Sequence, residues 1–100
     1  MNEVDFRAWL AQNATDKKVA SDLVSRLKRL EKEMNHCDID TEYRSDRCST
    51  LLSYFRKKGL NTEMNALNTS LPVGKYQLST YKYALNKYIA FLRETTLGEQ

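Results

Sequence analysis

The chain has 100 residues, enough for one compact domain and too few for two. Its 41% hydrophobic content supports a packed core, and its three glycines and one proline are too few for a turn-rich β fold, so an all-α fold is expected. No stretch has the roughly 20 apolar residues that cross a bilayer and no signal peptide is recognisable, so the chain is expected to be cytoplasmic, without a membrane partner.

The first predicted element is a short amphipathic helix that begins near Asn2 or Glu3. Phe6, Trp9 and Leu10 stand at i, i+3 and i+4, so they share one face, and Trp9 is expected to be largely buried. A polar loop from residue 12 to residue 16 follows this helix.

The second predicted helix is capped by Thr15 or Asp16 and ends around residues 35–36. Its apolar stripe comprises Val19, Ala20, Leu23, Leu27, Leu30 and Met34. The opposite side carries Ser21, Ser25, Lys28, Arg29 and Lys32.

A third helix is predicted after the connector at residues 38–41. Its buried side comprises Tyr43, Cys48, Leu51, Leu52 and Phe55, and the cations and glycine of residues 56–59 end it. Residues 60–78 are the least regular part, with one possible helical turn at 62–67 and a break at 71–74.

The last predicted helix begins at Ser79 or Thr80. Tyr81, Ala84, Leu85, Tyr88 and Leu92 face inward, flanked by Ile89 and Phe91. Lys82, Asn86, Lys87 and Arg93 lie outside. The whole chain is thus predicted to be one helical domain, residues 1–100, with an ordered core at about 4–94 and a polar tail at 95–100 that frays.

The charges are unevenly distributed although the net charge is only +3. Residues 17–32 hold six bases and two acids, residues 75–93 hold four bases and no acid, and acids gather at residues 38–46. Such segregation is typical of a domain that faces a polyanion. The alternative is that these bases only solvate helix surfaces, with pairs such as Lys28–Glu31 and Asp22–Arg26.

Two sets of residues are the candidate nucleic-acid contacts. Hydroxyls and cations suit phosphate oxygens, and tyrosine rings can stack on bases. The first set is Ser21, Ser25, Lys28, Arg29 and Lys32; the second is Lys75, Tyr76, Lys82, Tyr83 and Lys87. For Tyr76 and Tyr83 the alternative is an ordinary helix surface.

The sequence offers no chemistry typical of an enzyme. His36 is the only histidine, so neither a zinc site with Cys37 nor a base for a nucleophile is expected. The carboxylates at residues 38–46 are explained by helix capping, and the isolated glycines form no phosphate loop. No catalytic residue, metal, cofactor or small-molecule substrate is therefore expected, and Cys37 and Cys48 are expected to stay thiols.

The order of these segments resembles the SAM-like, core-binding N-terminal domain of tyrosine recombinases of the phage integrase type. The resemblance is carried by the Phe-x-x-Trp-Leu motif at 6–10, the run at 19–31, the Asp-Ile-Asp connector at 38–40 and the run at 79–92. The chain is also similar to small helical domains that precede catalytic domains in bacterial restriction-type proteins. It departs from the recombinases in its long connection at 60–78 and in lacking their Arg, His and Tyr catalytic domain.

The resemblance implies a four- or five-helix orthogonal bundle that holds DNA for a catalytic domain or partner protein. Together with the basic faces, it predicts a non-catalytic module that binds duplex DNA mainly through phosphates. The alternative is an adaptor that binds another protein or dimerises through an apolar surface.

Overall fold

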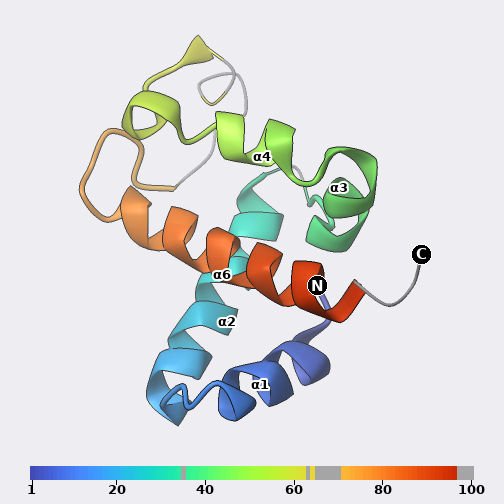
Figure 1. The fold of residues 1–100 in the computed structure, drawn as a ribbon. Helices are drawn as coiled ribbons and strands as arrows, with labels where there is room; N and C mark the ends of the chain where they lie inside the picture. Colours follow the sequence, from blue (N-terminus) through green and yellow to red (C-terminus); the bar gives the residue numbers. More distant parts are fainter. Residues whose placement is uncertain (35, 63, 65–70, 97–100) are drawn as a thin grey trace.

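The structure, a computed structural model, describes residues 1–34, 36–62, 64 and 71–96. These residues form five α-helices and one short 3₁₀-helix and contain no strand, which confirms the all-α prediction. In chain order the elements are α1 (Glu3–Gln12), α2 (Lys17–Glu33), α3 (Ile39–Asp46), α4 (Ser49–Ser53), η1 (Arg56–Gly59) and α6 (Leu78–Thr96) (Figure 1).

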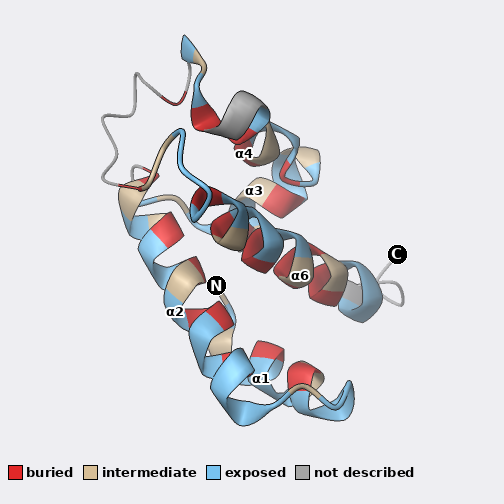
Figure 2. Ribbon diagram, turned by 90° about the vertical axis from the view of Figure 1, so that its left-hand side faces the viewer, coloured by how far each residue is buried: buried red, intermediate tan, exposed pale blue. Residues whose placement is uncertain are grey.

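Helix α6 lies at the centre of the bundle and contacts α1, α2, α3 and η1. Helix α2 crosses it, while α1 lies on one side of α6 and α3 and α4 lie on the other (Figures 1 and 2). The side chains on the inner face of α6 are buried, as the sequence predicts. They are Tyr81, Ala84, Leu85, Tyr88, Ile89, Phe91 and Leu92.

Helix α2 begins where the side chain of Asp16 accepts a hydrogen bond from the Lys18 amide at 2.8 Å. The predicted stripe of α2 is buried except for Val19, which is 46% exposed. Val19 lies in the first turn at the edge of the stripe, and Val24, nearer the centre of the stripe, is buried instead. The prediction for Val19 was therefore wrong.

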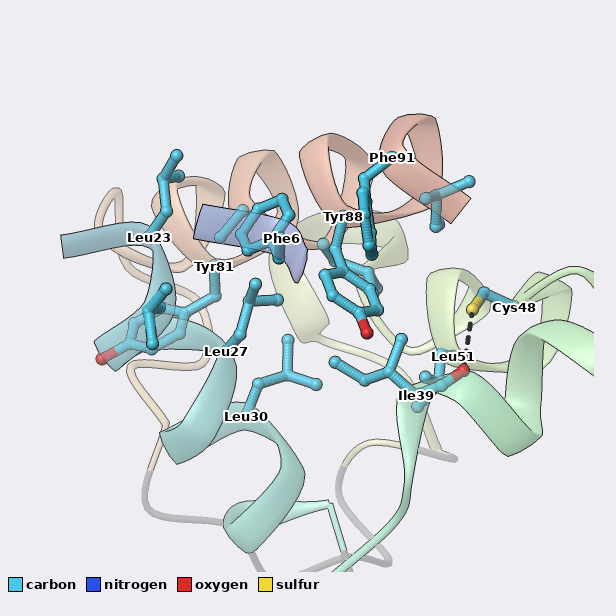
Figure 3. Packing of buried hydrophobic residues seen from close by; sticks show 14 of the residues in the cluster. Phe6, Leu23, Leu27, Leu30, Ile39, Cys48, Leu51, Tyr81, Tyr88 and Phe91 are labelled. Carbon is cyan, nitrogen blue, oxygen red and sulfur yellow. Dashed lines mark hydrogen bonds between the residues drawn. The ribbon is translucent and has the colours of Figure 1, made fainter. Parts of the chain in front are cut away.

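A cluster of aromatic rings joins α1 to α6 (Figure 3). The Phe6 ring lies edge-on to Tyr88 with centroids 4.9 Å apart and is 5.4 Å from Phe91. Trp9 also packs against this cluster, as predicted, and is less completely buried than Phe6; its indole N–H donates to the carboxylate of Glu94. The fused indole thus keeps one edge at the surface.

The predicted third helix is instead two helices. Arg47 and Cys48 follow α3 with φ angles of 59° and 64°, and this pair of left-handed residues interrupts the helix before α4. Asp46 stabilises the turn, because its carboxylate accepts hydrogen bonds from the amide (3.1 Å) and hydroxyl (2.5 Å) of Thr50 in α4. Tyr43, Cys48, Leu51 and Phe55 are buried as predicted, while Leu52 is only partly buried.

The boundaries of α6 differ slightly from the prediction. The helix begins at Leu78 and runs to Thr96, two residues into the predicted tail. Residues 97–100 and most of the predicted helical turn at 62–67 lie outside the described residues.

Candidate nucleic-acid interface

The five candidate residues of α2 share one exposed side, as the helical spacing predicts. Lys28 is nevertheless engaged within the protein, since its ammonium lies 2.7 Å from a carboxylate oxygen of Glu3 in α1. This contact, together with Arg7, holds the pKa of Glu3 below its ordinary value. The alternative pair Lys28–Glu31 does not form, because the Glu31 carboxylate accepts from the terminal amine of Met1 at 3.1 Å.

Arg29 is also bound within the fold. Its guanidinium donates to the Tyr81 hydroxyl at 2.9 Å, and its central carbon lies 5.7 Å from the centroid of the Tyr81 ring. The hydroxyl of Ser21 accepts a hydrogen bond from Arg7 at 3.4 Å. Three members of the α2 set therefore contribute contacts between helices, while Ser25 and Lys32 remain at the surface.

The second set lies along α6 and the turn before it. We use the name α6 face for the following exposed residues of this region: Lys75, Tyr76, Ser79, Lys82, Tyr83, Asn86 and Arg93. Among the described residues, no ion pair engages a cation of this face. Both tyrosines are exposed as predicted, Tyr76 to 84% and Tyr83 to 58%.

Lys87 differs from the other α6 cations. Its ammonium lies 5.7 Å from the centroid of the Trp9 ring, and the residue is only partly exposed. A cation over an indole face is held by the ring quadrupole, which leaves it less available to an external phosphate. Lys87 is therefore at the margin of the α6 face.

A pocket of about 370 Å³ adjoins the start of α6. It is lined by Phe55, Arg56, Lys75, Tyr76, Leu78, Ser79 and Lys82. Phe55 and Leu78 are almost completely buried and form its apolar part, while Arg56, Lys75 and Lys82 bring three positive charges to it. The pocket thus joins candidate residues of the α6 face to a residue of η1 that the sequence interpretation did not select.

Gly59 explains why η1 approaches α6 so closely. Its φ angle is +82°, which favours glycine, and a Cβ atom there would lie only 2.8 Å from a methyl group of Leu78. The sequence pattern predicted Gly59 as a helix end but carried no signal that Arg56 would face Lys75 and Lys82. Arg56 lies near these lysines because η1 packs against α6, a tertiary contact between segments that the irregular connection at residues 60–78 separates.

The positive character of the pocket comes from side chains and not from free helix amides. The amides of Leu78, Ser79 and Thr80 donate to the carbonyls of Lys75, Tyr76 and Gln77 at 3.1, 3.2 and 3.1 Å. The hydroxyl of Ser79 donates to the Tyr76 carbonyl at 2.8 Å. The amides of the first turn of α6 are thus satisfied by carbonyls of the preceding turn. The same hydrogen bonds fix the backbone positions of Lys75 and Tyr76.

A larger hollow, about 570 Å³, lies between α1, α3 and the end of α6. Its walls include Trp9, Tyr43 and Phe91, and its charged groups are Asp5, Asp40 and Arg44. Two carboxylates beside one cation would repel a phosphate, so this hollow does not extend the basic surface.

The cysteines and the histidine form no metal site in the described part of the chain, where no group of three or more His, Cys, Asp or Glu could hold an ion. Burial and neighbouring carboxylates raise the pKa of the Cys37 thiol to about 11 and that of Cys48 to about 12. Both cysteines are free thiols, as predicted.

Within residues 1–34, 36–62, 64 and 71–96, no helix has the length and apolar character to cross a membrane. Comparison of the chain with models of protein families, with curated proteins and with solved structures gave no match. The α6 face and its adjoining pocket are therefore the features on which a functional proposal depends.

Proposed function

We propose that this chain is a non-catalytic module that binds duplex DNA through the α6 face. The observation that carries the proposal is that this face combines exposed cations with exposed hydroxyl groups and that no acid occurs between residues 71 and 93. Cations and hydroxyls together match phosphate oxygens, which accept hydrogen bonds and carry charge. Most of the affinity would come from phosphates and would not depend on base sequence.

The distribution of acidic residues also supports DNA binding on the α6 face. The acidic residues Asp38, Asp40, Glu42 and Asp46 lie in or beside α3. Helix α3 contacts the second half of α6, where Asp40 accepts a hydrogen bond from Tyr88, while the pocket and Lys75 lie at the beginning of α6. A polyanion on the first half of α6 would thus meet cations and avoid the carboxylates.

We also propose that the bundle is of the SAM-like, core-binding type and that it positions DNA for a catalytic domain or partner protein. A short α1, a long α2, an acidic start of α3 and a long, central α6 follow the order that the resemblance implies. The break between α3 and α4 is a further departure from the pattern, beside the long connection at 60–78.

The proposal is tested by fluorescence anisotropy with a labelled blunt duplex over a salt series. The variant is Lys75→Gln/Lys82→Gln, and the matched control is Lys17→Gln/Lys18→Gln, which removes the same charge at the start of α2, away from the start of α6 (Figure 1). The logarithm of the wild-type affinity should fall linearly with the logarithm of salt concentration, and the α6 variant should flatten that slope by about 2.

The control variant should keep the wild-type slope. Equal slopes for the two double variants would overturn the assignment to the α6 face, and no binding of wild type even at low salt would overturn DNA binding itself. An adaptor that docks an apolar surface on a protein would instead show little dependence on salt.

A further inference from the structure

The pocket beside α6 differs from the rest of the α6 face in being concave and partly apolar. Its volume of about 370 Å³ lies near the lower end of the roughly 300–1,000 Å³ of ligand pockets. Its apolar part is formed by Phe55 and Leu78, which are 4% and 2% exposed. A continuous duplex backbone needs only a surface of cations, so this hollow offers more than phosphate binding requires.

The residues around the hollow provide two kinds of contact. Arg56, Lys75 and Lys82 suit a phosphate, and the Tyr76 ring at the rim presents an exposed aromatic face beside them. The Arg56 side chain is held in place at its Nε, which donates to the Ser53 carbonyl at 3.1 Å. A ligand with one aromatic ring system and one phosphate would use both kinds of contact at once.

We propose that this pocket binds one nucleotide unit, with its phosphate among Lys75, Lys82 and Arg56 and its base stacked on the exposed Tyr76 ring. A base inside a duplex is stacked on both faces and cannot enter a hollow, so the nucleotide must be unpaired. The inference rests on the proposed function and deepens it: the module prefers duplexes that end in an unpaired nucleotide. The ligand could come from either of two sources: the unpaired end of a DNA strand, or a free nucleotide, which carries the same base and phosphate.

The test compares a blunt duplex with duplexes of the same paired length that carry a three-nucleotide 5′ or 3′ overhang. Binding is measured by anisotropy at one salt concentration, with deoxyadenosine monophosphate as an unlabelled competitor. For wild type, at least one overhang duplex should bind about fivefold or more tightly than the blunt duplex, since one base stacked on an aromatic ring contributes at least that factor.

Variants at the two exposed tyrosines separate the pocket from the rest of the face. Tyr76→Ala should bring the ratio of overhang to blunt affinity close to 1, and Tyr76→Phe should keep it, because stacking needs the ring and not the hydroxyl. Tyr83→Ala, outside the pocket, should change both affinities by the same factor and leave their ratio intact. Tyr76 is 84% exposed, so its removal should not disturb the fold.

Each outcome separates this inference from the proposed function. Salt-dependent binding without any overhang preference, or a preference that survives Tyr76→Ala, overturns the pocket assignment and leaves duplex binding intact. Absence of binding to every DNA overturns the proposed function; resonance shifts by deoxyadenosine monophosphate confined to Tyr76, Lys75 and Lys82 would then still support a nucleotide pocket, with the free nucleotide as its source. No shift at these residues and no DNA binding would overturn both.

Discussion

The Lys28 ammonium in α2 and the Glu3 carboxylate in α1 lie 2.7 Å apart, so a lysine expected to face phosphates instead joins the first two helices. Glu3 also accepts a hydrogen bond from Arg7 at 3.0 Å, one turn further along α1. One carboxylate thus orients two cations, and the pair of helices is fixed partly by charge.

Glu3→Gln is expected to lower the melting temperature at neutral pH, because it removes the charge that attracts Lys28 and Arg7. The folded-state pKa of Glu3 is lowered by these contacts, so their stabilisation is present above the unfolded-state pKa and is lost as pH falls through the folded-state value. The melting temperatures of wild type and variant should therefore converge in acid. Asp22→Asn, at an exposed acid of α2, is the control. A difference that is constant with pH would contradict the role of this carboxylate.

Tyr88 provides a second test of how α6 is held in the bundle. Its ring is fully buried, while its hydroxyl donates to Asp40 at 2.6 Å and accepts from the Asn2 amide at 2.7 Å. Tyr88→Phe keeps the packing and leaves two partners without their bond, which typically costs about 1–3 kcal/mol of unfolding free energy. Urea denaturation measures this cost, and Tyr83→Phe, at an exposed ring, should show almost none. Equal values for the two variants would mean that water replaces the Tyr88 hydroxyl.

Helical periodicity was enough to predict α1, α2 and α6 and the side of each that packs inward. It identified Leu23, Leu27 and Leu30 in α2 and all seven inward residues of α6, because burial in one helix face follows directly from spacing. It could not predict the break at Arg47 and Cys48, where non-glycine residues adopt a left-handed conformation that costs about 1–2 kcal/mol each. At that break the Asp46 carboxylate accepts hydrogen bonds from the amide and hydroxyl of Thr50, contacts that the spacing of apolar residues does not reveal.

The candidate site was likewise predictable only in part: exposure followed from helical spacing, and contacts between helices did not. Spacing correctly placed Tyr76 and Tyr83 at the surface and Lys28 and Arg29 on one side of α2. Spacing within a helix contains no information on which residue of another helix lies opposite, so the partners Glu3 and Tyr81 were not foreseen. The pocket was missed for the same reason, since η1 and α6 are brought together by a tertiary contact.

The thiols of Cys37 and Cys48 are expected to react slowly with Ellman's reagent in the native protein at pH 8. Burial raises their pKa values to about 11 and about 12, so only a small fraction is present as the reactive thiolate. Cys48 is fully buried and its thiol donates to the Ile39 carbonyl at 3.8 Å, so it should react after Cys37. In urea both should react quickly. Reducing agent should leave the melting temperature unchanged, and a large decrease would reveal a disulfide.

The last prediction compares the two basic faces directly. In the triple variant Lys28→Gln/Arg29→Gln/Lys32→Gln, three phosphate contacts would be lost if the whole α2 face bound DNA, and the salt slope would flatten by about 3. Lys28 is already paired with Glu3 and Arg29 with Tyr81, so only Lys32 is expected to contribute. A flattening of about 1 or less is therefore expected, smaller than the value of about 2 for Lys75→Gln/Lys82→Gln.

The triple variant also removes contacts of the fold, so its melting temperature must be measured beside its affinity. Loss of the Arg29–Tyr81 bond should lower stability, while Lys32→Gln alone, at an exposed position, should leave it unchanged. The salt series is then run at a temperature at which wild type and variant are both folded. A slope change near 3 in the folded variant would show that DNA competes successfully for Lys28 and Arg29, and would move the duplex interface from α6 to α2.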